Sequence, residues 1–143
     1  MPLVLAALLG IFLTGCGGGG EGTSQSSVSP TLATQTLNWV PPTTYADNSA
    51  MNPYQDMDYY EIYVRTTDTN FTDNEAPVAQ LAAVTNVLSP DGITYNQVLT
   101  SDFALNNLLP FTQPGAVYYM SVKSVSINGM KSGFSQPVIW DLT

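Results

Sequence analysis

Short stretches of alternating apolar and polar side chains follow residue 32, and this pattern of period two predicts β-strands. The clearest strands span residues 59–65 and 117–125, and shorter strands are expected over residues 35–40 and 137–140. One face of these strands is apolar and supplies the expected core. Its members are Leu37, Trp39, Tyr60, Ile62, Val64, Met120 and Val122.

Residues that end or reverse strands lie between these stretches. Pro41-Pro42 ends the first strand, because proline has no N–H to donate to a strand ladder. Asn128-Gly129 predicts a tight hairpin after the strand over residues 117–125. We therefore expect neighbouring strands to run antiparallel.

The stretch between the two clearest strands is less regular. Residues 93–100 predict a strand, residues 78–84 fit either a strand or a helical turn, and residues 103–109 show no clear pattern. The sequence contains no convincing amphipathic helix and no internal repeat. Strands separated by turns at short spacing predict an all-β fold, a single antiparallel β-sandwich.

The beginning of the chain has a different character. Residues 3–13 form an uncharged apolar run, about as long as the apolar region of a signal peptide and shorter than the ~20 residues that a membrane-spanning helix needs. The single cysteine, Cys16, follows this run, and four glycines follow the cysteine. The alternative is a buried thiol after a hydrophobic helix, but a helix that runs into four glycines has nothing to pack against.

The residues from Leu13 to Cys16 resemble the signal of bacterial lipoproteins, in which a leucine, a small residue and Gly or Ala precede the cysteine. The resemblance implies that residues 1–15 are removed and that Cys16 carries a diacylglyceryl group on its thiol and a fatty acid, such as palmitate, on its new amine. Several acyl chains anchor a protein stably, since each buried CH₂ contributes about 0.8 kcal/mol. The chain departs from the family in having no Lys or Arg before Cys16. Gly17 follows the cysteine where a retention signal would have Asp, which in this family favours the outer membrane.

Three regions follow from this division. Residues 1–15 are predicted to be the signal peptide, residues 16–31 the lipidated cysteine and a tether rich in glycine and serine, and residues 32–143 the folded domain. A flexible tether of this length has a reach of roughly 20 Å. It would hold the domain near the membrane through the lipid on Cys16 without setting its orientation.

Composition narrows the chemistry that the chain can perform. The net charge is −8, with Arg65, Lys123 and Lys131 as the only cationic side chains, so binding to nucleic acid is not expected. There is no histidine, and no free thiol remains once Cys16 is lipidated, so a Ser-His or Cys-His pair is not possible. We therefore predict a protein that is not an enzyme and that has no cofactor or metal.

The predicted strands, in their order and spacing, resemble a fibronectin type III domain, in particular a bacterial subgroup with a doubled tyrosine in the sixth strand. Residues 39–42 match the tryptophan and prolines of its second strand, residues 60–64 its third strand and residues 118–122 its sixth. The resemblance implies an immunoglobulin-like β-sandwich, with Tyr118 closing a corner through a hydrogen bond between its hydroxyl and the backbone. The region from Asp68 to Asn107 is longer than the family needs, which points to an insertion.

In this fold the third and sixth strands are neighbours in one sheet. Their outward residues then form one candidate binding surface, which we call the tyrosine face. It consists of Tyr59, Tyr63 and Tyr119, flanked by Arg65 and Lys123. Tyrosine is enriched at protein interfaces because it combines a large apolar area with a polar tip. The alternative is that these tyrosines only stabilise the sheet as cross-strand pairs.

Two groups of acidic residues are candidate metal or catalytic sites. Residues 68–75 place oxygen ligands at close spacing, but the sixth position is Asp73 where a calcium-binding EF-hand loop needs Gly, and Ala79 stands where it needs Glu. Asp47, Asp56 and Asp58 form the second group. We interpret both as solvated surface loops.

The sequence leads to one functional hypothesis and two alternatives. The leading hypothesis is a lipid-anchored bacterial envelope protein, placed at the outer membrane, that displays a fibronectin type III-like module for binding a protein or glycan. The first alternative is a structural spacer or accessory subunit of an envelope complex with no ligand of its own. The distant alternative is a carboxylate-based glycan hydrolase. Tyrosines covered by the region from Asp68 to Asn107 would favour the spacer.

Overall fold

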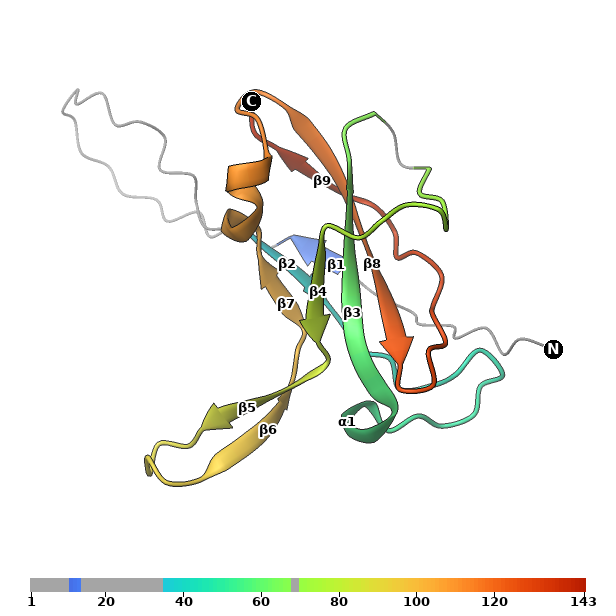
Figure 1. Ribbon diagram of the computed structural model, residues 1–143, viewed down its shortest axis with the longest axis vertical. Helices are drawn as coiled ribbons and strands as arrows, with labels where there is room; N and C mark the ends of the chain where they lie inside the picture. The colour runs from blue at the N-terminus through green and yellow to red at the C-terminus, as the bar shows by residue number, and fades with distance from the viewer. Residues whose placement is uncertain (1–10, 14–34, 68–69) are drawn as a thin grey trace.

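The computed structural model of this chain describes residues 11–13, 35–67 and 70–143, and it consists mainly of antiparallel β-strands (Figure 1). The expected all-β class is therefore confirmed. Cys16, the predicted tether and most of the predicted signal peptide lie outside the described residues.

The strands form two larger sheets and one separate hairpin. The three-stranded sheet has the order β1–β2–β7, with β1 Ile11–Leu13, β2 Thr36–Trp39 and β7 Asp102–Ala104. The four-stranded sheet has the order β4–β3–β8–β9, with β4 Ala79–Ala82, β3 Met57–Arg65, β8 Val117–Ser126 and β9 Val138–Asp141. The hairpin pairs β5 Val84–Leu88 with β6 Tyr95–Leu99. The helical turns are α1 Pro53–Asp56 and the 3₁₀ helix η1 Leu105–Phe111.

One core joins the two larger sheets. The ring of Trp39 on β2 lies 5.0 Å from the ring of Tyr60 on β3, so residues of both sheets pack directly on each other. Six of the seven side chains expected in the core are buried, and Val64 is partly buried against them. The prediction from alternation is thus confirmed, because a residue's place in a strand of period two decides which face it shares.

The less regular stretch is resolved into separate elements. Residues 78–84 contain β4 and the start of β5, so the strand alternative was correct, and the strand expected over residues 93–100 is β6. Residues 103–109 contain the end of β7 and most of η1. The turn at Asn128-Gly129 also forms, since Gly129 has φ 78° and the N–H of Ser126 donates to the carbonyl of Met130 at 2.9 Å.

Tyr118 closes a corner as expected. Its hydroxyl accepts a hydrogen bond from the backbone N–H of Gln113 at 2.8 Å, and its ring lies 5.8 Å from that of Trp140. The bond ties the start of β8 to the segment that precedes it. Tyr118 is also buried, so the ring contributes to the core while the hydroxyl satisfies the backbone.

Strand β1 extends the three-stranded sheet beyond β2. Ile11 lies opposite Trp39 and Leu13 opposite Leu37 in an antiparallel register. These residues belong to the segment that the sequence assigns to the signal peptide. Strand β2 is therefore paired on one side with β7 and on the other with residues outside the predicted mature domain.

Candidate functional site

The tyrosine face lies on β3 and β8, which are neighbours as expected. Arg65 lies directly opposite Tyr119, and Tyr63 lies opposite Ser121. The expected exposure of this face is wrong in part, because Tyr63 is 3% exposed and Lys123 is 5% exposed. Tyr59, Tyr119 and Arg65 are half-buried.

Two segments cover the centre of the tyrosine face, and they bring aromatic rings onto it. The ring of Phe134 contacts that of Tyr63 edge-on at a centroid distance of 4.9 Å, and the ring of Phe71 lies 5.4 Å from that of Phe134. The ammonium group of Lys123 lies 4.0 Å from the centre of the Phe134 ring, within the range of a cation–π interaction. Tyr63 and Lys123 are thus buried by residues that follow β3 and β8 in the chain.

Beneath this cover, Glu61 is the centre of a buried polar cluster. Its side chain is 2% exposed, and its carboxylate accepts hydrogen bonds from the Tyr63 hydroxyl at 2.6 Å, from the Lys131 ammonium at 2.9 and 3.0 Å and from the Gln80 amide at 3.3 Å. Burial by itself would raise the pKa of Glu61. The hydrogen bonds and the charge of Lys131 together outweigh this effect, so the pKa lies below its usual 4.5. Burial and the nearby Glu61 carboxylate raise the pKa of Tyr63 well above its usual value. The sequence placed Glu61 on this face but did not identify Lys131 as its partner.

The three cationic side chains of the protein all bind carboxylates. Lys131 pairs with Glu61, Arg65 with Glu75 at 2.6 Å, and Lys123 with Asp73. The hydrogen bond and charge of Lys123 hold the pKa of Asp73 below its usual range. Asp73 and Glu75 of the acidic stretch over residues 68–75 therefore neutralise the face that they cover.

The second acidic group also bonds locally. Asp47 accepts from the N–H of Ser49 at 2.9 Å, and Asp56 accepts from the N–H of Asn52 at 2.7 Å. Across residues 11–13, 35–67 and 70–143, no three His, Cys, Asp or Glu side chains converge to hold a metal ion.

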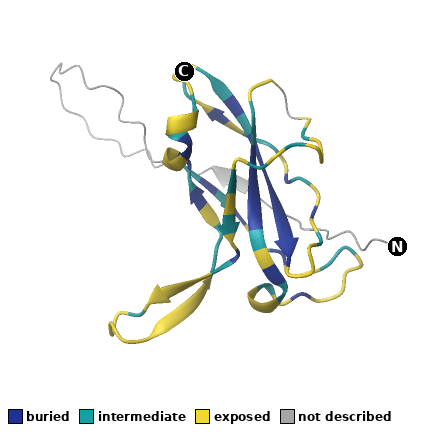
Figure 2. Cartoon of the chain, viewed as in Figure 1, coloured by how far each residue is buried: buried dark blue, intermediate teal, exposed yellow. Residues whose placement is uncertain are grey.

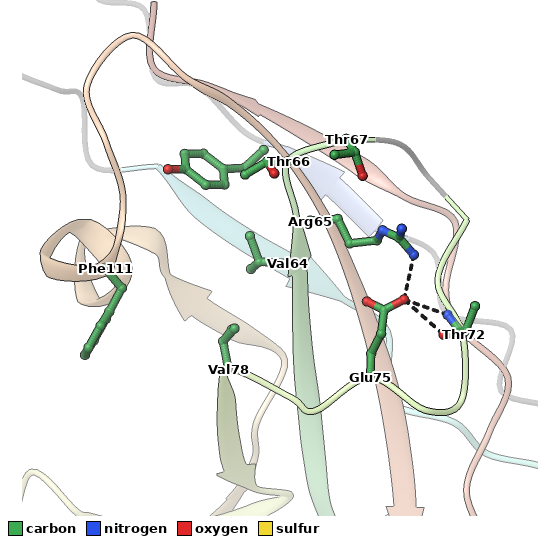
Figure 3. A pocket seen from close by; sticks show the side chains of 9 residues that line it. Val64, Arg65, Thr66, Thr67, Thr72, Glu75, Val78 and Phe111 are labelled. Carbon is green, nitrogen blue, oxygen red and sulfur yellow. Dashed lines mark hydrogen bonds and ion pairs between the residues drawn. The ribbon is translucent and has the colours of Figure 1, made fainter.

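Beside the tyrosine face lies an open groove of about 630 Å³ (Figure 3). The exposed ring of Phe111 and the half-exposed side chain of Val78 stand at one end, and the Arg65–Glu75 pair lies at the other (Figure 3). Glu75 also accepts from the backbone N–H of Thr72 at 2.8 Å. The lining carboxylate is therefore held by the protein's own donors.

The β5–β6 hairpin forms a second candidate surface, which the alternation of residues along the chain does not indicate. It projects from the two larger sheets, and its side chains are exposed over nearly its whole length (Figures 1 and 2). We call its exposed apolar side chains the hairpin surface. They are Val87, Leu88, Ile93, Tyr95 and Val98, which are 50%, 49%, 81%, 67% and 43% exposed.

The turn of the hairpin is stabilised by Asp91. Its carboxylate accepts from the N–H groups of Ile93 at 2.9 Å and Thr94 at 3.0 Å, and from the Thr94 hydroxyl at 2.8 Å. These hydrogen bonds lower the pKa of Asp91. Gly92 takes the left-handed conformation with φ 70° that the turn requires. The hairpin therefore has a locally ordered tip although it does not pack on the core.

The signal for this surface was present in the sequence. Residues 83–101 contain one charged side chain, Asp91, and several β-branched or aromatic residues on both sides of the turn. Large exposed apolar patches on a soluble protein mark interaction sites or aggregation sites. Alternation alone did not find it, because the same pattern predicts a strand whether or not another layer covers it.

No known protein family, characterised protein or solved structure was found to match this chain. None of the helices within the described part of the chain has the length and apolar character needed to cross a membrane.

Proposed function

We propose that this protein is a lipid-anchored protein of the bacterial envelope whose fibronectin type III-like domain binds its partner through the β5–β6 hairpin. The observation that carries the proposal is the hairpin surface, which presents five large apolar side chains to solvent. A two-stranded hairpin is only marginally stable in water on its own. Leu88 and Tyr95 lie on one face of the hairpin, and Val87 and Val98 lie on the other. A partner that covers either face removes apolar area from water and supports the hairpin at the same time.

The sheet topology supports the fibronectin type III-like assignment. Strands β2 and β7 pair in one sheet, β4, β3, β8 and β9 follow one another in the other, and Tyr118 forms the expected corner bond. The hairpin lies within the region from Asp68 to Asn107, which the sequence marked as longer than that family needs. It is therefore an addition to the fold, and function is frequently carried by such additions.

The anchor is supported by the sequence from Leu13 to Cys16 and by the glycine-rich tether that follows. Removal of residues 1–15 would also remove β1 and expose the edge of β2 that it covers. The tether begins beside the membrane under this proposal and would let the domain and its hairpin sample a range of orientations.

The spacer alternative is favoured by one specific observation. Tyr63 and Lys123, which the sequence placed on a binding surface, are covered by residues of this chain, including Phe71 and Asp73 from the region after Asp68. The tyrosine face is thus partly occupied by the protein itself. A spacer of this kind would need no partner at either surface, which distinguishes it from the proposal.

Changing Cys16 to Ser is expected to abolish incorporation of labelled palmitate and to lower recovery of the protein in the membrane fraction. The serine hydroxyl cannot form the thioether on which the lipid is built, so the acyl chains that anchor the protein are lost. Labelling in cells followed by membrane fractionation measures both effects. Gly18→Ser changes the same tether without touching the thiol and should keep the label. Labelled palmitate on the Cys16→Ser protein would contradict the anchor.

Replacing Val87, Ile93 and Tyr95 together with Ser is expected to abolish capture of envelope partners by the full-length, tagged protein. These side chains supply the most exposed apolar area of the hairpin, and none of them is in the core. The matched control is Tyr59→Ser with Tyr119→Ser on the tyrosine face. Loss of capture with the control pair and retention with the hairpin variant would move the binding site to the tyrosine face. Capture of nothing by the unchanged protein would favour the spacer.

A further inference from the structure

We propose that the hairpin binds a second copy of the same chain, with the free edge of β6 pairing antiparallel to the free edge of the other copy's β6. This inference rests on the proposed function, since it names the partner of the hairpin surface. The pairing would join two two-stranded hairpins into one four-stranded sheet. Three or more strands with an apolar face are what a small sheet needs to be stable in water.

The backbone of β6 has donors and acceptors that point away from β5. In an antiparallel pair, hydrogen-bonded residue pairs alternate with pairs that are not hydrogen-bonded. The N–H of Ser89 donates to the carbonyl of Thr94, and the N–H of Thr100 donates to the carbonyl of Ala83, each at 2.8 Å. With this register, Val98 and Asn96 bond to β5.

Thr94, Asn96, Val98 and Thr100 thus bond toward β5, and the residues that alternate with them turn their N–H and C=O groups outward along the free edge of β6. These outward residues are Tyr95, Gln97 and Leu99. Such an edge is a template for another strand, and proteins usually protect it with a lysine, a proline or a covering segment. Residues 93–101 contain no charge and no proline, so this edge carries none of the side-chain protection.

The distribution of charge decides where two copies of this chain can meet. Each chain carries a net charge of −8, so two copies repel each other over most of their surface. The hairpin is the exception, because Asp91 is its single charged residue and lies in the turn. Two copies that meet along β6 bring together their least charged segments and keep their acidic residues apart.

The apolar side chains favour β6 over β5 as the contact edge. Ile93 and Tyr95, on the β6 side of the turn, are the most exposed apolar residues of the hairpin. A two-fold axis beside Gln97 would place Gln97 opposite its own counterpart and Tyr95 opposite Leu99 of the second copy. An aromatic residue opposite an aliphatic one is a favourable cross-strand pair, and the two glutamine amides can bond to each other. A tether on a shared membrane would raise the effective concentration of the copies.

The symmetry gives a sharp test by charge exchange at Gln97. Two differently tagged copies of the full chain are expressed together, both with Cys16→Ser so that no lipid or thiol contributes and residues 1–15 stay on the chain. One tag is captured in detergent, and the recovery of the other copy is measured. Gln97→Lys in both copies should reduce this recovery to background, because like charges would lie directly opposite each other.

Combining a Gln97→Lys copy with a Gln97→Glu copy should restore recovery to the level of the unchanged pair or above it. This restoration also shows that the variants are folded. Asn86→Lys in both copies makes the matching change on the free edge of β5 and should leave recovery unchanged.

The proposal is overturned if the unchanged copies do not recover each other, if Gln97→Lys in both copies has no effect, or if the mixed pair does not regain binding. Its failure is distinguishable from failure of the proposed function. Hairpin-dependent capture of a different envelope protein, with no recovery of the second copy, would leave the hairpin as the binding surface and remove self-pairing. Palmitate labelling of Cys16 tests the anchor independently of both.

Discussion

Replacing Trp39 with alanine is expected to lower the free energy of unfolding by about 3–5 kcal/mol. The side chain is 3% exposed, and its ring packs on Tyr60 from the opposite sheet at a centroid distance of 5.0 Å. Truncation would leave a cavity where the two sheets meet, and the surrounding strands can close it only in part. Urea unfolding followed by tryptophan fluorescence and circular dichroism measures the effect.

The neighbouring residue provides the control for this prediction. Val40 follows Trp39 in the chain but is 53% exposed, so Val40→Ala should change the free energy of unfolding by no more than about 0.5 kcal/mol. Because small domains have total stabilities of only about 5–15 kcal/mol, the Trp39 variant would lose a large share of its stability. Equal, small losses in the two variants would show that the sheets do not share one core.

Replacing Glu61 with glutamine is expected to lower the free energy of unfolding at neutral pH by about 1–3 kcal/mol. Glutamine has nearly the same shape, but it removes the charged acceptor that serves the Tyr63 hydroxyl and the Lys131 ammonium. The Tyr63 hydroxyl is buried, so it cannot exchange the lost bond for water, whereas Lys131 is more exposed and can be hydrated again. Urea unfolding of both proteins measures the difference.

The dependence of this difference on pH identifies the carboxylate as its cause. The pKa of Glu61 is lower in the folded protein than its usual value of 4.5. The stabilisation from its ionised form is therefore complete above about pH 4.5 and is lost as the pH falls through the folded-state pKa. We expect the two proteins to converge in stability at acid pH. A difference that stays constant across this range would contradict the assignment.

Glu75→Gln is the matched control on the same face. Its carboxylate pairs with Arg65 at 2.6 Å, but the two side chains are 25% and 24% exposed. Pairs that are accessible to water contribute about 0–1 kcal/mol, so this change should cost less than Glu61→Gln. A larger loss at Glu75 would place the stabilising centre of this face in the covering segment and not in β3.

The strands and their inward faces could be predicted because the relevant signal is local. Alternation over a few residues decides that Tyr60 and Ile62 share a face, and Gly129 allows the left-handed turn after β8. The corner bond of Tyr118 could be expected only from the family resemblance. Its donor is the backbone N–H of Gln113, five residues earlier, and strand alternation does not predict such a bond. Each of these features joins residues that are close in sequence or in adjacent strands.

The burial of the tyrosine face could not be predicted in the same way. Tyr63 and Lys123 are in outward positions by alternation, yet Phe71, Asp73 and Phe134 fold over them from other segments. A strand pattern states which face a side chain is on, and it does not state whether another segment covers that face. In the hairpin the difference is reversed: its apolar residues follow the pattern of a core strand, but no other segment covers them and they are exposed.

The all-β class, the core residues and the restriction of cationic charge to three side chains follow from local periodicity and composition. Long-range folding brings Arg65, Lys123 and Lys131 to Glu75, Asp73 and Glu61 on one covered face. It also leaves β5 and β6 as a separate two-stranded sheet with exposed apolar side chains. The physical reason is the same in both cases: burial depends on which distant segments meet, and no local pattern records that.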